Sequence, residues 1–383
     1  MRRAFVIVMD ACGVGALPDA DAYGDDPSSN TLEHVAELAG GLDLPALEAL
    51  GLGCIEPLRG VAPVPDPVLH GRLAPLGPGK ESVTGHWELM GVVPPVALPT
   101  YPEGFPDEVV AQLERATGAR FCCNRPYSGT EVLKDFGEHH LRTGELILYT
   151  SADSVLQIAA HHDVIDEPGL HALCAAAREV MQGEHAVGRV IARPFTGPPG
   201  DFVRTTGRHD YSLVPPGRSY LEVLQEAGVS VHGVGKIRDL FAGVGIDVSH
   251  PGATNPEAIA STTDLVATLD QGLVFVNLVD TDQIFGHRHD VAGFAGALQA
   301  IDAAVGGWLE RLTAEDMLVL TADHGVDPTS GHTDHTREYA PLLARFRGGR
   351  GARHDGLLAD VGASVVQWLT GHGTPGMPGH SFV

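Results

Sequence analysis

The chain has 383 residues, which favours two or three domains at about 150 residues per domain. Its 49 acidic residues outnumber its 25 Lys and Arg residues, and the resulting formal charge of −24 argues against binding to nucleic acid or to an anionic membrane. With 43% hydrophobic and 19% charged residues, the composition is that of a folded globular protein and excludes a disordered acidic tail.

Cysteine usage and the first residues predict a cytoplasmic protein. The five cysteines include no Cys-x-x-Cys pair, so they support neither a disulfide framework nor a zinc ribbon. Asp10 interrupts the apolar run that begins at Ala4, which leaves it too short for a signal peptide. Because no apolar stretch approaches the roughly 20 residues of a membrane span, we expect a soluble chain.

Its oligomeric state stays open, with a monomer plausible.

Apolar β-branched runs alternate with helix-like periodic segments, a pattern typical of a mostly parallel α/β sheet flanked by helices. Gly118 and Gly228 lie where helix C-caps are expected, and Asn255 before Pro256 is the expected N-cap of a helix. In chain order we predict strand 4–9, helix 107–117, strand 145–150, helix 170–181, strand 188–195, helix 255–269, strand 273–279, helix 291–312, strand 317–322 and helix 356–369.

Two proline-rich segments, 94–106 and 215–217, enclose a self-contained set of predicted helices and strands. We therefore predict that residues 97–214 form a smaller α/β domain inserted into a larger domain made of residues 1–96 and 215–383. The alternative is one continuous domain with irregular loops.

Three predicted strands end in aspartate: Asp10 follows the first, Asp280-Thr281-Asp282 the second and Asp323 the third. Because the carboxyl ends of parallel strands form the ligand crevice of an open α/β sheet, we expect these carboxylates to converge. Together they would repel one another, and a cation would turn that repulsion into coordination. The alternative is that each Asp caps a helix.

Histidines near the same strand ends support a metal site. His287 follows Asp282 by five residues, His324 is adjacent to Asp323, and His335 follows in the next loop. Asp and His ligands without a thiolate suit Mn²⁺, Mg²⁺ or Zn²⁺, and six ligands are too many for one tetrahedral ion. We therefore expect two divalent ions about 3.5–4 Å apart, with Mn²⁺ as the first choice.

A hydroxyl group precedes a predicted helix in GKESVTGHWE. The segment is not a phosphate-binding loop, because Glu81 follows Lys80 where Ser or Thr is needed. Either Ser82 or Thr84 could act as a nucleophile there, since a helix start favours an anion and a metal ion lowers the pKa of a hydroxyl. The simpler alternative for a Ser in this place is an N-cap.

Several long motifs closely resemble the phosphopentomutases, which are two-metal phosphotransferases of the alkaline phosphatase superfamily. The resemblance covers nearly the whole chain. It is carried by VIVMDACGVG, GKESVTGHWELMG, PEGFP, YTSADSVLQIAAH, RVIARPF, GRHDYS, NLVDTDQIFGHRHD, TADHGVDP and GHTDHTRE. It implies an alkaline-phosphatase-like core with a central, mostly parallel sheet flanked by helices, and an inserted cap domain for substrate specificity.

The resemblance also implies roles for individual residues. It places Ser82, not Thr84, as the phosphorylated residue. It divides the metal ligands into Asp282, His287 and His335 on one ion and Asp10, Asp323 and His324 on the other. Two departures stand out: Glu81-Ser82 replaces the usual Asp-Thr, and Val326 replaces a frequent Asn.

Further residues are implied to hold the substrate. The segment Ser151-Ala152-Asp153 resembles a sugar-contacting segment, with Asp153 suited to accept hydrogen bonds from ribose hydroxyls. The expected ligands of the distal phosphate are four cations: Arg193, Arg204, Arg208 and Lys236. For each Arg, the alternative is a solvated surface charge.

The activity implied by the resemblance is that of an isomerase in nucleoside and pentose phosphate salvage. It interconverts α-D-ribose 1-phosphate and D-ribose 5-phosphate, and their deoxyribose analogues, through phospho-Ser82 and a bisphosphorylated sugar. One alternative is a metal-dependent phosphomonoesterase or sulfatase of the same superfamily, in which water attacks the phosphoserine. An alternative of another class is a metal-binding protein without catalysis.

Overall fold

The computed structural model describes residues 2–151 and 153–383. The chain forms two compact units, which we call the larger unit, Met1–Val96 with Pro215–Val383, and the inserted unit, Ala97–Val214. Among the described residues, no helix combines the length and the apolar character needed to cross a bilayer.

The larger unit is built on an eight-stranded sheet with the order β10-β9-β11-β1-β12-β13-β2-β14, counted over the described residues. The strands β10, β9, β11, β1 and β12 run parallel, whereas β13 is antiparallel to both of its neighbours. The strands are β1 (Arg3–Met9), β2 (Leu69–Ala74), β9 (Val231–Val234), β10 (Val248–His250), β11 (Gly272–Leu278), β12 (Asp316–Thr321), β13 (Ala340–Arg345) and β14 (Gly356–Leu357).

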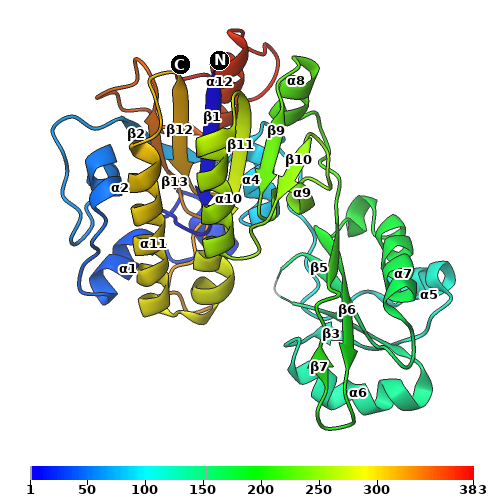
Figure 1. Ribbon diagram of the computed structural model, residues 1–383. Helices are drawn as coiled ribbons and strands as arrows, with labels where there is room; N and C mark the ends of the chain where they lie inside the picture. Colours follow the sequence, from blue (N-terminus) through cyan, green and yellow to red (C-terminus); the bar gives the residue numbers. More distant parts are fainter. Residues whose placement is uncertain (1, 152) are drawn as a thin grey trace. The chain divides into compact units, whose positions relative to one another are not determined.

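Helices cover both faces of this sheet (Figure 1), with α10 and α11 on one face and α4, α8, α9 and α12 on the other. Because both faces are covered, the central strands read as continuous apolar runs, and β1 is buried from its second residue onward. The helices are α1 (Thr31–Leu38), α2 (Pro45–Leu50), α3 (Leu52–Ile55), α4 (Ser82–Leu89), α8 (Tyr220–Glu226), α9 (Ile237–Leu240), α10 (Asn255–Thr268), α11 (Val291–Leu309) and α12 (Ala359–Thr370).

The predicted α/β class is confirmed, and one N-cap and two helix starts need correction. The helix predicted from residue 170 begins at Glu167, because the Asp166 side chain caps it by accepting a hydrogen bond from the Gly169 N–H at 2.9 Å. Asn255 is the first residue of α10, and the N-cap is Thr254. The reason is tertiary: the Asn255 side chain accepts a hydrogen bond from the backbone N–H of Asp280 at 3.0 Å, so it joins a strand end instead of capping its own helix. The helix predicted from residue 356 begins at Ala359, because Gly356 and Leu357 form β14 beside β2.

The inserted unit has a sheet of its own, with six strands among its described residues and helices on both faces (Figure 1). Alternate residues of its second strand face opposite layers, so Leu146 and Leu148 pack toward α5 and α7, whereas Ile147 and Tyr149 pack toward α6. Its strands are β3 (Phe121–Pro126), β4 (Leu146–Thr150), β5 (Val155–His161), β6 (Arg189–Thr196), β7 (Val203–Arg204) and β8 (His209–Ser212), and its helices are α5 (Asp107–Thr117), α6 (Glu131–Thr143) and α7 (Glu167–Val180).

Candidate metal and phosphoryl-transfer site

Three neighbouring parallel strands place the three predicted aspartates together. The strand β1 lies between β11 and β12 in register, with Val8 opposite both Asn277 and Thr321. Asp10 and Asp323 therefore leave the sheet at the same edge. Asp282 reaches this edge from the π-helical turn Thr281–Phe285 that follows β11, and such turns are frequent at functional sites.

Asp10, Asp323 and His324 form one compact buried group, whose ligand atoms lie within 4.8 Å of one another. The His324 Nε2 atom is 3.3 Å from Asp10 Oδ1 and 3.4 Å from Asp323 Oδ2. His324 Nδ1 donates to the Gly325 carbonyl at 3.1 Å, so Nε2 is the ring atom that faces the two carboxylates.

A second group surrounds Asp282. The Asp282 Oδ1 atom is 3.3 Å from His335 Nε2 and 3.4 Å from His287 Nε2. His287 Nδ1 donates to the Thr333 carbonyl at 2.7 Å, so its Nε2 atom faces the carboxylate. His324 is shared between the groups, because its ligand atom lies within 4.8 Å of those of Asp282 and His335 as well.

The donor set fits divalent ions. One oxygen of each of the three carboxylates, on Asp10, Asp282 and Asp323, is buried without a hydrogen-bond donor in good geometry among the described residues. Leaving a buried carboxylate oxygen unpaired is costly, and coordination of a cation removes that cost. Three carboxylates and three imidazoles, two of them held with Nε2 directed inward, are suitable ligands for Mn²⁺, Mg²⁺ or Zn²⁺.

The electrostatics of these residues show how strongly the carboxylates interact. Burial raises the pKa of Asp10, and the Asp323 and Asp282 charges raise it further. Burial alone would lower the pKa of His324, but the Asp323 and Asp10 carboxylates hold it well above the usual value. Burial also acts to raise the pKa of Asp282, but His335 and His287 lower it far below the normal range. The cluster thus concentrates negative charge that a bound cation would balance.

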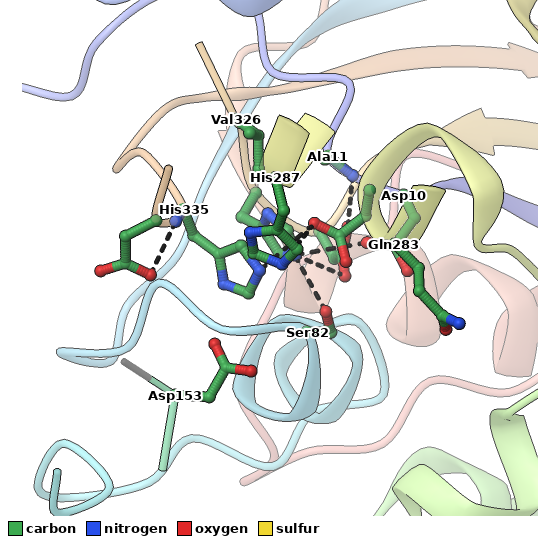
Figure 2. Close-up of polar contacts among 12 residues, drawn as sticks. Asp10, Ala11, Ser82, Asp153, Gln283, His287, Val326 and His335 are labelled. Carbon is green, nitrogen blue, oxygen red and sulfur yellow. Dashed lines mark hydrogen bonds and ion pairs between the residues drawn. The ribbon is translucent and has the colours of Figure 1, made fainter. Parts of the chain in front are cut away.

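Ser82 is the first residue of α4, and its hydroxyl faces this cluster (Figure 2). Its Oγ lies 3.0 Å from His324 Nε2. Ser82 is not an N-cap, because Glu81 occupies that position and makes no side-chain capping bond. The Thr84 hydroxyl instead donates to the Glu81 carbonyl at 3.1 Å. Of the two candidate hydroxyls, that of Ser82 is placed next to the carboxylates and imidazoles.

Two buried residues at the site were not predicted. His86 Nδ1 is 3.1 Å from Asp323 Oδ2 and 2.8 Å from the Ser82 carbonyl. The Asn277 side-chain amide donates to Asp10 Oδ2 at 2.7 Å. A sequence signal existed for each of them, since Asn277 is an amide within an apolar buried strand and His86 lies four residues after Ser82 on one helix face.

Ala11 has a strained backbone at the same place (Figure 2). Its φ of +62° lies in the left-handed region, which is unfavourable for a residue with a Cβ atom. The conformation directs the Ala11 N–H toward Asp323 Oδ1 at 3.3 Å. Strain of this kind is maintained where the surrounding structure requires it, often at functional sites.

Two basic side chains, those of Arg337 and Lys80, hold the loop that leads to Ser82. Arg337 is 5% exposed, and its guanidinium donates to the carbonyls of Gly77 and Gly79 at 3.1 and 2.6 Å, as well as to Asp19. Lys80 Nζ donates to Asp25 Oδ1 at 2.9 Å. These contacts fix the backbone immediately before Ser82.

Asp280 and Val326 near the site serve structural roles. The Asp280 carboxylate accepts a hydrogen bond from the Asn255 N–H at 2.9 Å, so this aspartate joins a strand end to the first turn of α10. Val326 is 1% exposed, and its backbone N–H donates to the Thr31 hydroxyl at 2.9 Å. Its apolar side chain stands where the phosphopentomutases that the sequence resembles often have Asn.

The predicted substrate residues fall in both units. Lys236 belongs to the larger unit, where its amine contacts Gln283, the neighbour of Asp282. The other predicted residues belong to the inserted unit. Ser151 is half-buried there, and Ala152 lies outside the described residues. The Asp153 Oδ2 atom is 3.7 Å from Arg189 Nη2.

The three predicted arginines of the inserted unit share one electrostatic environment around Tyr149, and all three charges lower its pKa against the raising effect of burial. Arg193 donates to Gln157 at 3.1 Å, and burial lowers its pKa to about 10, with Arg208 and Arg204 acting in the same direction. Arg208 makes two hydrogen bonds of 2.7 Å to Asp210. Clustered guanidinium groups in a strongly acidic chain are suited to binding an anion.

Known proteins are similar to this chain over nearly its whole length. Residues 2–371 match the Metalloenzyme superfamily. The phosphopentomutase of Caldanaerobacter subterraneus subsp. tengcongensis is 48% identical, covering 96% of this chain and 94% of the relative. The phosphopentomutase of Anaeromyxobacter dehalogenans is 49% identical, covering 96% of this chain and 95% of the relative. The solved phosphoglycerate mutase of Leishmania mexicana has a TM-score of 0.46 at 12% identity, covering 98% of this chain and 96% of that one. The chain belongs to the phosphopentomutase family of the Metalloenzyme superfamily and is a metal-dependent isomerase.

Proposed function

We propose that this enzyme interconverts α-D-ribose 1-phosphate and D-ribose 5-phosphate, and their deoxyribose analogues, with Ser82 as the phosphoryl carrier. The observation that carries the proposal is the contact of 3.0 Å between Ser82 Oγ and His324 Nε2, at the edge of a cluster of buried carboxylates and imidazoles. Ser82 also begins an eight-residue helix, and backbone N–H groups at a helix start favour a phosphoryl group.

We propose that the six clustered residues hold two divalent ions. Asp10, Asp323 and His324 would hold the one next to Ser82, and Asp282, His287 and His335 the other. The oxygen and imidazole donors suit Mn²⁺, with Mg²⁺ or Zn²⁺ as alternatives. Bound ions would offset negative charge on the transferring phosphoryl oxygens and keep the Ser82 oxygen deprotonated between transfers.

The reaction then needs two transfers through one oxygen. In the first, the bond between phosphorus and Ser82 Oγ breaks as a bond to the free sugar hydroxyl forms, and the hydroxyl proton passes to solvent. The resulting sugar carries two phosphates. In the second transfer, Ser82 Oγ takes the other phosphoryl group from the sugar, and the sugar oxygen recovers a proton. The net result moves the phosphate between the two ends of the pentose and regenerates phospho-Ser82.

The inserted unit would serve as the cap that recognises the sugar. Asp153 would accept ribose hydroxyls next to Ser151, and the distal phosphate would bind Arg193, Arg204 and Arg208 together with Lys236. We propose that this binding favours a sugar over water as the phosphoryl acceptor, which separates a mutase from a phosphatase. A cytoplasmic location is part of the proposal, since the cysteines form no disulfide framework.

The replacement of Ser82 by Ala tests the proposal. Ser82→Ala should lose conversion of ribose 5-phosphate to ribose 1-phosphate by at least about a thousandfold, because the phosphoryl carrier is gone. Peptide mass spectrometry should find phosphate on Ser82 of the wild-type enzyme. The matched control is Thr84→Val, which removes the other hydroxyl and should leave Ser82 phosphorylated.

Three results would contradict this function. Phosphate found on Thr84 would show that the wrong hydroxyl was chosen. Release of free phosphate and ribose without ribose 1-phosphate would show a phosphomonoesterase. Unchanged turnover in Ser82→Ala, with Mn²⁺ bound as in the wild type, would show that Ser82 takes no part.

A further inference from the structure

A second group of metal-ligating side chains lies in the inserted unit and takes no part in the function proposed above. It consists of Cys122, His139 and Glu145, whose ligand atoms all lie within 4.8 Å of one another. We call it the thiol–imidazole–carboxylate cluster. It combines three types of side chain that bind zinc in proteins, from three separate places in the fold.

The local fold brings these side chains together. Cys122 lies on the edge strand β3 opposite Ile147 of β4, and its thiol donates to the Leu146 carbonyl at 3.6 Å. His139 lies in the last turns of α6, and Glu145 directly precedes β4. The cluster therefore sits where a helix end meets the start of two parallel strands.

The helix end is fixed by bonds other than those within the cluster. His140 Nδ1 donates to the Glu145 carbonyl at 2.6 Å, and its Nε2 accepts from the His161 N–H at 2.8 Å. The Thr143 hydroxyl donates to the His139 carbonyl at 2.9 Å and accepts from the Glu145 N–H at 3.2 Å. The backbones of His139 and Glu145 are thus held in place before any ion arrives, which reduces the entropic cost of binding.

The cluster is open to solvent. The side chains of His139 and Glu145 are 37% and 38% exposed and already share a contact of 2.7 Å between Nε2 and Oε2. Cys122 is half-buried against the apolar layer between α6 and the sheet. An ion can reach the three ligand atoms from solvent, and water can fill a fourth position as in tetrahedral zinc sites.

We propose that Cys122, His139 and Glu145 bind one divalent ion of the zinc class. The thiol loses its proton to solvent on binding. Arg142 donates to His139 Nδ1 at 3.2 Å, so Nε2 carries the ring proton in the ion-free protein. This proton is exchanged to Nδ1 when Nε2 takes the ion, and the exposed Arg142 side chain turns away. A thiolate ligand distinguishes this site from the oxygen and imidazole cluster of the larger unit, which suits Mn²⁺.

Cadmium titration of the full chain in saturating Mn²⁺ tests this site, because Cd²⁺ bound to thiolate gives an ultraviolet charge-transfer band. We expect a band that saturates at about one Cd²⁺ per chain and that Zn²⁺ removes by competition. Cys122→Ser should abolish the band. His139→Gln and Glu145→Gln should each weaken Cd²⁺ binding by at least about tenfold. The adjacent Cys123→Ser is the matched control and should keep the wild-type titration.

Several outcomes would overturn the site. One is the absence of a saturable band in the wild type, and another is a band that persists in Cys122→Ser. Wild-type affinity in His139→Gln would also overturn it, and this variant changes a side chain that is 37% exposed. If the band is lost in Cys123→Ser and kept in Cys122→Ser, the thiolate ligand is Cys123, and the proposed assignment to Cys122 is wrong. None of these readouts depends on Ser82 or on isomerase activity.

Discussion

Asn277 illustrates how one neutral side chain orients a charged neighbour. Its amide donates to one oxygen of Asp10 at 2.7 Å, while the other oxygen of Asp10 has no hydrogen-bond donor in good geometry among the described residues. The amide therefore orients the carboxylate so that the second oxygen faces the cluster. Partners of metal ligands commonly affect affinity in this way.

Replacing Asn277 by Leu should weaken metal binding without changing a ligand. The isosteric side chain keeps the volume within the buried strand but leaves Asp10 without its donor. We expect Mn²⁺ affinity to fall by about 10–100-fold, measured by calorimetric titration. Urea unfolding of the metal-free variant serves as the control for folding. Wild-type Mn²⁺ affinity in a folded variant would show that Asn277 does not orient Asp10.

At the level of single residues, the sequence indicated those site members that follow strands. Asp10, Asp282 and Asp323 could be predicted to meet because each ends a strand-like run. His86 and Asn277 could not be assigned, because their roles depend on which helix packs beneath which strand. The strain at Ala11 is likewise produced by tertiary contacts, and nothing in its local sequence requires a positive φ.

Among the elements, the loop before α4 depends on a side chain from far along the chain. Arg337 bonds two carbonyls of this loop and also Asp19, and its guanidinium lies over the ring of Tyr23 with 4.4 Å to the ring centroid. A single planar group thus joins the backbone that carries Ser82 to the segment after β1. A lysine amine would not reach all of these acceptors.

Arg337→Lys should therefore reduce turnover more than substrate binding. A displacement of Ser82 by even 1 Å can cost about a hundredfold in rate, so we expect kcat to fall by about 10–100-fold with KM within about threefold. The matched control is Arg350→Lys, an exposed residue paired with Asp66, and its kinetics should not change. A rise in KM at unchanged kcat would contradict the positioning role.

The ion pair between Arg3 and Asp316 joins the first residues of β1 and β12. The Asp316 carboxylate accepts two bonds from Arg3, at 2.7 and 2.8 Å, and two from Thr313, at 2.8 and 2.9 Å. Burial acts to raise the pKa of Asp316, but the Arg3 and Thr313 bonds lower it below its ordinary value. The carboxylate thus stabilises the fold above its unfolded pKa, and this contribution is lost as pH falls through the lower folded pKa.

Asp316→Asn should show this pH dependence. At pH 7 we expect the free energy of unfolding of the larger unit to fall by about 1–3 kcal/mol, since charge-assisted bonds are replaced by neutral ones. The difference from the wild type should shrink as pH falls below about 4, where the unfolded carboxyl is protonated. Urea titrations at neutral and acidic pH measure both values. A difference that grows in acid would contradict the assignment.

Prediction was less complete for element boundaries than for element types. The strand before Asp10 and the helix from Asp107 were found within a residue. The N-cap of α10 was assigned to Asn255 instead of Thr254, because the side chain of Asn255 bonds the neighbouring strand end. The start of α12 was misplaced because a two-residue strand beside β2 precedes it. Both differences arise from contacts between distant segments, which local patterns do not encode.

For the whole molecule, two units with separate cores predict more than one thermal transition. Ions that bind only the folded larger unit should raise its free energy of unfolding, by about 4 kcal/mol at a thousandfold excess over Kd, and with it the temperature of its transition. Calorimetry with increasing Mn²⁺ should therefore move one transition and leave the other in place. Asp282→Asn should reduce the shift. Equal movement of both transitions would contradict a metal cluster confined to the larger unit.

The arrangement of the strands could be predicted only in part. The alternation of strands and helices indicated a mostly parallel sheet, and five neighbouring strands are parallel. The position of antiparallel β13 between β12 and β2 could not be predicted from the local sequence. The reason is that β13 pairs with strands from distant parts of the chain.

The position of β1 has a consequence during synthesis on the ribosome. Both of its neighbours, β11 and β12, come from Gly272 onward, whereas the inserted unit is one continuous stretch that ends at Val214. At about 5–20 residues per second, the nascent apolar strand waits on the order of tens of seconds for its partners. The inserted unit can complete its own fold in that time. The nascent strand β1 therefore stays without its sheet partners until translation is nearly finished, which leaves its apolar surface open to aggregation.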